Sequence, residues 1–224
     1  MIYLVRAELP ENRQTSLAGA IPLKIRLEGA TGLPCLIRWF SDVSLAEVRR
    51  LPVRAIVIAG FAADIETMGE AAFRPLTEAV MGAEVPIMGI CGGHQLLGCM
   101  FGGDPWQNFP MRPLRPGEPD VSDYHPGMFK EWGFHTVRKV GTDPLFDGLP
   151  DDMVFSQSHY CEIRTLPPDF ELIATNDNCR VQAMRHRSRP IWGAQFHWER
   201  FTDHYPHGRA VMENFFREAG IATS

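Results

Sequence analysis

Residues 86–101 read Pro-Ile-Met-Gly-Ile-Cys-Gly-Gly-His-Gln-Leu-Leu-Gly-Cys-Met-Phe, and this stretch decides the fold. A short apolar run ends in Gly-x-Cys-x-Gly and passes directly into a second apolar segment of helical character. The pattern is typical of a nucleophile elbow, a tight strand-to-helix turn whose flanking glycines let neighbouring backbone approach closely. We therefore expect Cys91 at a helix N-terminus, where partial positive charge favours the thiolate and the N–H of Gly92 can face an oxyanion.

Three more apolar runs precede this turn and alternate with helix-like segments. Because the runs are almost continuously apolar, they are typical of parallel strands that are covered on both faces. The βαβα order predicts an α/β fold of three layers, with a mostly parallel central sheet, helices on both faces and the elbow at a strand end. The expected strands are 2–5, 35–40, 55–60 and 86–90, and the expected helices are about 15–27, 44–50 and 66–81.

The second half of the chain differs in character. Six prolines from Pro105 to Pro126 predict a long irregular loop, because each proline fixes φ and removes a hydrogen-bond donor. Such a loop is either a lid or partner surface, or a plain irregular surface segment. Beyond it we expect short strands at 134–140, 153–156, 171–175, 181–185 and 191–196, and a closing helix at 208–219. We expect one single domain over residues 1–224.

Composition excludes several classes of protein. With 22 Lys+Arg against 27 Asp+Glu the net charge is −5, so we expect no nucleic-acid partner. The longest uncharged stretch, 85–103, holds six glycines and a proline, so we expect no membrane span. Five cysteines without a Cys-x-x-Cys pair favour reduced thiols, and therefore a cytoplasmic protein. We expect neither a bound metal nor a cofactor. His204 and His207 are poor metal ligands, because Pro206 breaks the helix that would align them.

A second motif lies near the C-terminus, where residues 191–199 read Ile-Trp-Gly-Ala-Gln-Phe-His-Trp-Glu. In an extended segment, residues i and i+2 point to the same side, so His197 and Glu199 could hydrogen-bond to each other. Glu199 would then fix the tautomer of His197, and His197 would serve Cys91 as base and later as acid. A surface histidine beside a surface glutamate is the simpler interpretation of this motif taken alone.

Together the two motifs resemble the class I, triad-type glutamine amidotransferases. The family is similar in Gly-Ile-Cys-x-Gly-x-Gln, which stands here at 89–95, and in Gly-x-Gln-Phe-His-x-Glu, which stands at 193–199. Weaker similarities lie at 131–134, 144–150 and 156–159, so the resemblance runs from about Ala55 to the end. It implies a flavodoxin-like sheet and an enzyme with a cysteine nucleophile.

The resemblance also implies a mechanism. Cys91 would attack the side-chain amide of glutamine, form a glutamyl thioester and release ammonia, and water activated through His197 would free glutamate. Gly92 and the turn at Gly60-Phe61 would supply the oxyanion donors, and Gln95 would border the glutamine pocket. The Ser158–Tyr160 stretch, which includes His159, would contact the amino-acid head through its main chain.

Two residues depart from the family pattern. Phe61 stands where a glycine is usual, so the oxyanion turn must accept a side chain, and a wrong peptide orientation would cost about 10²- to 10³-fold in rate. Trp198 stands where a proline is usual and could form a wall of the pocket or part of a partner surface. Neither departure removes a member of the expected triad.

Three functions remain open on the sequence. The leading one is a glutaminase that passes ammonia to a separate synthetase subunit, since the chain has no Gly-rich phosphate loop of the Lys-Ser/Thr type. The second is a stand-alone γ-glutamyl hydrolase with the same triad acting on a larger γ-glutamyl amide, which the changes at Phe61 and Trp198 motivate. The third is a catalytically silent regulatory module, although such a relative would be expected to lose Cys91 or His197.

Overall fold

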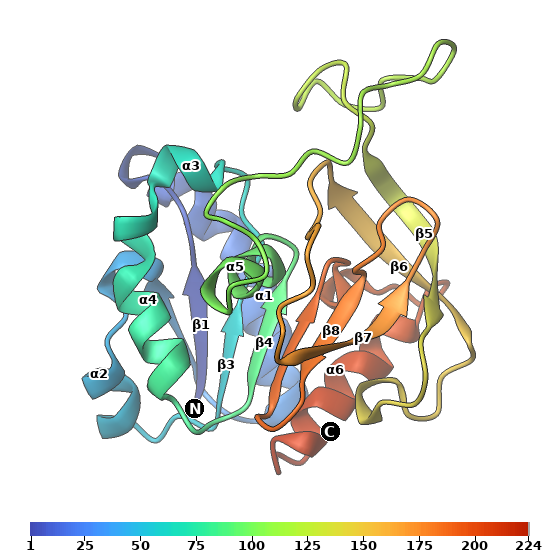
Figure 1. The fold of residues 1–224 in the computed structure, drawn as a ribbon. Coiled ribbons are helices and arrows are strands. Elements are labelled where there is room, and N and C mark those ends of the chain that lie inside the picture. The colour runs from blue at the N-terminus through green and yellow to red at the C-terminus, as the bar shows by residue number, and fades with distance from the viewer. Residues whose placement is uncertain (224) are drawn as a thin grey trace.

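The structure is a computed structural model that describes residues 1–223. Nine strands form one sheet in the order β2-β1-β3-β4-β9-β8-β7-β5-β6 (Figure 1). All four pairings from β2 to β9 are parallel, which confirms the predicted α/β fold and gives this half its flavodoxin-like order. The strands of this half are β1 Ile2–Arg6, β2 Cys35–Trp39, β3 Ala55–Ile58, β4 Ile87–Ile90 and β9 Ile191–Ala194.

The other half of the sheet is antiparallel. It extends the parallel half through the β9–β8, β8–β7, β7–β5 and β5–β6 pairings. Its first two strands are longer than the apolar pattern indicated, because β5 and β6 begin and end with polar residues that pair across the ladder, such as Glu131 with His159. The strands are β5 Glu131–Lys139, β6 Asp152–His159, β7 Phe170–Thr175 and β8 Ala183–His186.

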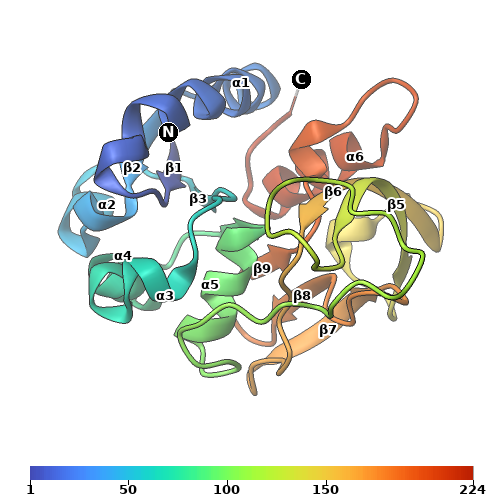
Figure 2. The same cartoon turned by 90° about the horizontal axis from the view of Figure 1, so that it is seen from above.

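Helices cover both faces of the parallel half, as predicted (Figure 2). Leu23 and Leu27 of α1 share one core cluster with Phe215 of α6, whereas Phe73 of α4 and Leu97 of α5 belong to the cluster on the opposite face. The helices are α1 Arg13–Thr31, α2 Leu45–Arg50, α3 Ile65–Met68, α4 Glu70–Gly82, α5 Gly92–Met100 and α6 His207–Glu218. Short 3₁₀ turns lie at Pro10–Asn12, Phe40–Asp42, Pro144–Phe146 and Trp198–Arg200.

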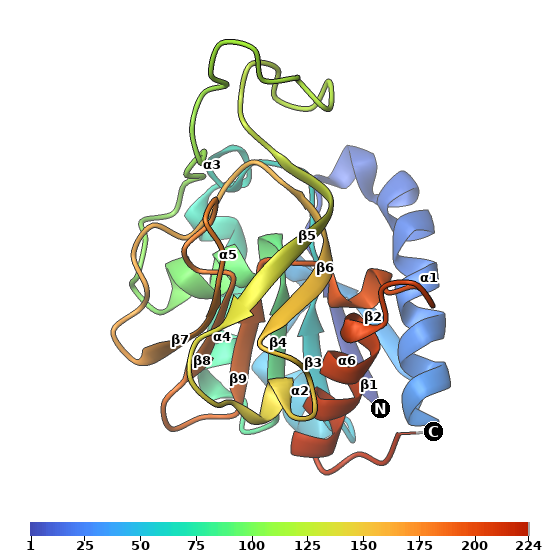
Figure 3. The same cartoon turned by 90° about the vertical axis from the view of Figure 1, so that its right-hand side faces the viewer.

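Two segments outside the sheet can be compared with the sequence prediction, namely the helix expected over 66–81 and the proline-rich loop. The helix expected over 66–81 is two helices, because Gly69 between α3 and α4 has φ 78, which breaks the helical path. The proline-rich segment between α5 and β5 forms a long loop without a named helix or strand, and it rises beyond the carboxyl ends of the parallel strands (Figure 3). Within residues 1–223 no helix is both long enough and apolar enough to cross a bilayer.

Candidate active site

The turn between β4 and α5 has the geometry of a nucleophile elbow. Cys91 adopts φ 51 and ψ −109, a positive-φ conformation that a non-glycine residue rarely holds without functional reason. Two glycines make the turn possible. A Cβ on Gly93 would lie 2.1 Å from the Ile58 carbonyl oxygen, and one on Gly89 would lie 2.6 Å from the Gly93 oxygen. The Gly-x-Cys-x-Gly spacing therefore reflects the close approach of α5 to the sheet.

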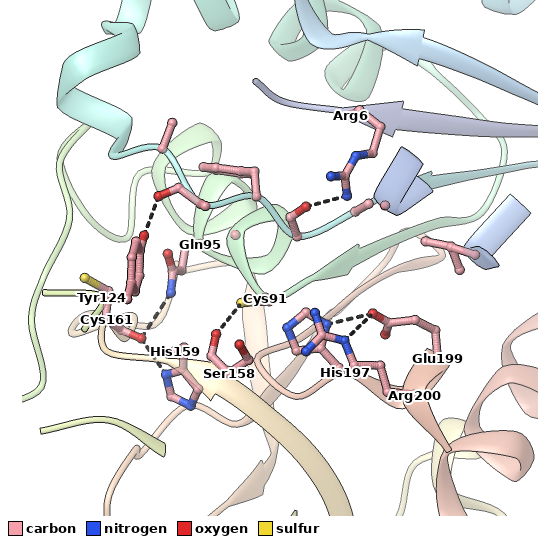
Figure 4. Close-up of a pocket in the computed structure, with 18 of the residues that line it drawn as sticks. Arg6, Cys91, Gln95, Tyr124, Ser158, His159, Cys161, His197, Glu199 and Arg200 are labelled. Atoms are coloured by element: carbon pink, nitrogen blue, oxygen red, sulfur yellow. Dashed lines mark hydrogen bonds and ion pairs between the residues drawn. The ribbon is translucent and has the colours of Figure 1, made fainter. Parts of the chain in front are cut away.

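The Cys91 side chain is nearly buried, at 7% exposure, and opens onto a cavity. Its backbone N–H donates to the Ala194 carbonyl at 2.8 Å, which joins the elbow to the end of β9. The sulfur lies 3.9 Å from the Ser158 carbonyl oxygen (Figure 4). It also lies 3.6 Å from Nε2 of Gln195. The nucleophile candidate is thus held by β6 and by the end of β9, two segments that are distant from it in the sequence.

His197 and Glu199 are in direct contact, with His197 Nδ1 2.7 Å from Glu199 Oε1. The expected cause of this contact was wrong, because β9 ends at Ala194 and Glu199 lies on the 3₁₀ turn Trp198–Arg200, so the segment is not extended. The tight turn brings the carboxylate back to the ring. Arg26 of α1 holds this turn through a hydrogen bond to the Glu199 carbonyl at 2.6 Å.

Electrostatics couple the sulfur to the imidazole. Burial alone would raise the pKa of Cys91, but the charge of His197, a hydrogen bond to its ring and the charge of His159 bring that pKa below its ordinary value. Burial likewise opposes the charged form of His197, yet the charges of Glu199 and Cys91 raise its pKa to about 9. The arrangement favours a thiolate beside an imidazolium, which is the reactive state of a cysteine nucleophile.

The turn after β3 approaches this pair closely. A Cβ on Gly60 would lie 3.2 Å from both Cβ of Cys91 and Cε1 of His197, so Gly60 packs against the two side chains. The turn accommodates Phe61 by laying its ring on Gly92, where a Cβ would meet Phe61 Cε1 at 2.6 Å. Among residues 1–223, the N–H groups of Phe61 and Gly92 have no hydrogen-bond partner, so two free donors flank Cys91.

Trp198 does not form a wall of the cavity. Its side chain is fully buried in the core cluster beneath α6, and the Gly208 backbone packs directly on the Trp198 main chain. The expected role of Trp198 at the pocket or at a partner surface is therefore wrong. The substitution for proline places a large apolar side chain in the core.

Two of the expected substrate-binding residues face the cavity with defined partners. Gln95 donates its Nε2 to the Cys161 carbonyl at 3.1 Å and to Gln195 Oε1 at 3.0 Å. Its own carbonyl oxygen has no hydrogen-bond partner within residues 1–223, so it can accept from a ligand. Tyr160 also lines the cavity, and its hydroxyl donates to Asp64 Oδ1 at 2.6 Å.

The ring of His159 contacts the buried carboxylate of Glu131, a contact that no sequence pattern predicted. Its Nδ1 lies 2.8 Å from the Cys161 carbonyl and its Nε2 lies 2.9 Å from Glu131 Oε2. Both neighbours are acceptors, so the ring carries two protons. Burial opposes both charges, but the ion pair raises the pKa of His159 and lowers that of Glu131 to about 2. Amides of Asn176, Asn178 and Gln182 also donate to this carboxylate.

The cavity has a volume of about 720 Å³ and extends to both sides of Cys91. On one side lie Gln95 and Tyr124, and on the other lie Arg6 and Arg200 (Figure 4). The lining also includes Asn108, Tyr160, Arg26 and Phe201. No pattern in the sequence pointed to these arginines, to Tyr124 or to Asn108. Arg6 lies at the end of β1, Arg26 lies on α1, and Arg200 follows the His-x-Glu motif. Asn108 and Tyr124 lie in the long loop between α5 and β5. Within residues 1–223 no three His, Cys, Asp or Glu side chains cluster as metal ligands would.

Comparison with known proteins assigns the class of this fold and site. Residues 30–219 match the family model of the glutamine amidotransferase class-I domain, and the chain belongs to this family of enzymes. It is 31% identical over 176 residues to a glutamine-hydrolysing GMP synthase subunit of Pyrococcus furiosus, and the match covers 79% of this chain and 81% of that one. It is 35% identical over 148 residues to the subunit of the same description from Methanopyrus kandleri, at 66% and 67% coverage.

A solved structure supports the fold independently. The glutamine amidotransferase of Methylobacillus flagellatus superposes with a TM-score of 0.63 at 16% identity, and the match covers 100% of this chain and 96% of that one.

Proposed function

We propose that this chain is a glutaminase in which Cys91, His197 and Glu199 form the catalytic triad. The observation that carries the proposal is the coupling of the Cys91 thiol to a His197 ring held by Glu199 at 2.7 Å. Cys91 attacks the side-chain amide carbon of glutamine, and the tetrahedral oxyanion is received by the N–H groups of Phe61 and Gly92. His197 protonates the departing nitrogen, so ammonia leaves and a glutamyl thioester remains on Cys91. Water that gives a proton to His197 then hydrolyses the thioester and frees glutamate.

The side of the site that binds the substrate is proposed to be formed by Gln95, His159 and Tyr160. The free carbonyl oxygen of Gln95 accepts a hydrogen bond from the substrate, while the Ser158–Tyr160 main chain contacts its amino-acid head. The His159 ring is turned to Glu131 and Cys161, so it holds this strand in place rather than reaching the ligand with a ring nitrogen.

We further propose that the ammonia is used by a separate synthetase subunit. Relatives described as glutamine-hydrolysing subunits of GMP synthase support this division of labour. The test is glutamate release from glutamine by the purified chain, alone and with the synthetase subunit of a GMP synthase or another candidate. Absence of glutamate under every condition, with no difference between the parent and Cys91→Ala, would refute the proposed function.

A second candidate is a γ-glutamyl hydrolase that uses the same triad on a larger amide. The cavity favours it, because the space continues past His197 toward Arg26 and Phe201, where the leaving group of such an amide would lie. A panel of γ-glutamyl amides distinguishes the two activities, since turnover of glutamine far above all other amides would reject the hydrolase.

A further inference from the structure

Arg6, the last residue of β1, contacts the oxyanion turn in a way that the expected triad does not explain. Its Nη1 donates to the Gly60 carbonyl oxygen at 2.8 Å, and its Nη2 donates to Ser16 Oγ at 2.9 Å. Its Nε is buried without a partner among residues 1–223, and no carboxylate forms an ion pair with the guanidinium there. The charges of Glu8 and Glu199 offset part of the cost of burying this cation, but the hydrogen bonds of the guanidinium go to the Gly60 carbonyl and to Ser16 rather than to a carboxylate.

The carbonyl that Arg6 holds belongs to the peptide between Gly60 and Phe61. A trans peptide is planar, and its C=O and N–H point in opposite directions. Figure 4 shows the hydrogen bond from Arg6 reaching the turn on the side away from Cys91. Fixing the Gly60 oxygen toward Arg6 therefore fixes the free N–H of Phe61 toward the cavity, where Cys91 lies.

The turn has little else to fix this peptide. Among residues 1–223 the Phe61 N–H has no hydrogen-bond partner, and the position after Gly60 holds a bulky side chain. The Phe61 ring packs on Gly92, but this contact constrains the side chain and not the direction of the peptide plane. A hydrogen bond from a charged donor is stronger than one from a neutral donor, so the Arg6 contact is suited to hold the plane.

We propose that Arg6 is a positioning residue for catalysis, which locks the Gly60–Phe61 peptide in the orientation that presents the Phe61 N–H to the oxyanion. This inference rests on the proposed function of the triad. Arg6 acts on the transition state alone, because the oxyanion exists only there. Its two hydrogen bonds go to Gly60 and Ser16, and neither goes to the Cys91 sulfur.

The test compares Arg6→Met with the parent chain and with Ser16→Ala, which removes the other partner of Arg6 but keeps its bond to Gly60. For Arg6→Met we expect kcat for glutamine to fall by about 10²- to 10³-fold, the loss typical of one oxyanion donor, with KM within about twofold. Ser16→Ala should retain kcat within about threefold of the parent. If Arg6→Met does not fold, Arg6→Lys serves instead. Its kcat should fall at least about tenfold, because an ammonium on a flexible stem lacks the planar fork of the guanidinium and holds the Gly60 carbonyl less rigidly.

Two further measurements separate this role from others. Alkylation of Cys91 by iodoacetamide forms no oxyanion, so its rate and pH profile should be the same in Arg6→Met and the parent. A crystal structure of Arg6→Met should show the Gly60 carbonyl turned away from its parental direction. A kcat close to that of the parent, a raised KM at constant kcat, or alkylation that falls in parallel with kcat would each overturn the proposal. If the parent itself hydrolyses no amide, the proposed function fails, and an unmoved Gly60 carbonyl in the variant overturns the role of Arg6 separately.

Discussion

His197 Nδ1 lies 2.7 Å from Glu199 Oε1, and a 3₁₀ turn rather than a strand makes this contact. The carboxylate is among the groups that raise the pKa of His197 to about 9, so it favours the protonated ring beside Cys91. The raised pKa of His197 sets the direction in which the rate depends on pH. The imidazolium needed to protonate the leaving ammonia is lost as the pH rises through about 9.

Glu199→Gln should therefore lower kcat by about 10²-fold or more and move the alkaline limb of the pH profile to lower pH. The amide keeps the shape of the side chain but removes the charge that raises the pKa of His197. Initial rates of glutamate release across the pH range test the prediction. An alkaline limb that stays in place in the variant would contradict it.

The five cysteines should differ sharply in reactivity toward iodoacetamide near neutral pH. The pKa of Cys91 is lowered by His197, whereas burial raises the pKa of Cys35 to about 11 and of Cys99 and Cys161 to about 12, and raises that of Cys179 well above its ordinary value. We expect one label per chain, at Cys91, with Cys91→Ser as the unlabelled control. Peptide mass mapping gives the site. A Cys91 pKa near the ordinary thiol value of about 8.5, without glutaminase activity, would favour the silent module.

Gly93→Ala should destabilise the fold by about 3 kcal/mol. The added methyl would lie 2.1 Å from the Ile58 carbonyl oxygen, which is backbone and cannot rotate away. Gly29→Ala is the matched control, because an added Cβ there meets nothing within 4 Å, and alanine should stabilise α1 by about 0.5–1 kcal/mol. Urea unfolding of the three proteins measures both changes. Equal midpoints for Gly93→Ala and the parent would show that the elbow is less tightly packed than the structure indicates.

Glu131→Gln should destabilise the protein by about 3 kcal/mol or more, since it removes one partner of a buried ion pair. The pKa of Glu131 is lowered to about 2 from 4.5, so its contribution is present above 4.5 and is lost as the pH falls toward 2. The pKa of His159 is raised from 6.5, so its contribution is present below 6.5 and is lost as the pH rises beyond it. The difference in unfolding free energy should be largest between about pH 4.5 and 6.5. A difference that does not change with pH would contradict the ion pair.

Features that depend on neighbouring residues were predictable from the sequence. The elbow lies in one continuous stretch, where strand, glycines and helix each have a local signature, and the α/β alternation follows from runs of apolar residues. His197 and Glu199 were paired correctly from their spacing, but for the wrong backbone, since periodicity does not show that β9 stops at Ala194. The break at Gly69 was also missed, because the apolar spacing continues on both sides of it.

Features assembled from distant segments were not predictable. The Glu131 cluster draws its amide donors from residues 176, 178 and 182, and no single stretch shows that these groups meet. Arg6 and Gly60 are likewise 54 residues apart and meet only because β1 and β3 are adjacent parallel strands. The catalytic roles of Cys91, His197 and Glu199 stay predictions, which the rate measurements above decide.

The contrast among the buried cysteines has a consequence for oxidative stress. Peroxide attacks thiolates much faster than protonated thiols, and Cys91 is the cysteine whose environment favours the ionised form. The first sulfenic acid would form on the very atom that performs the proposed attack, while the four protonated cysteines stay intact within the packed interior. A brief oxidative exposure would thus silence the protein without unfolding it, and a thiol reductant would restore it as long as oxidation had not passed the sulfenic stage.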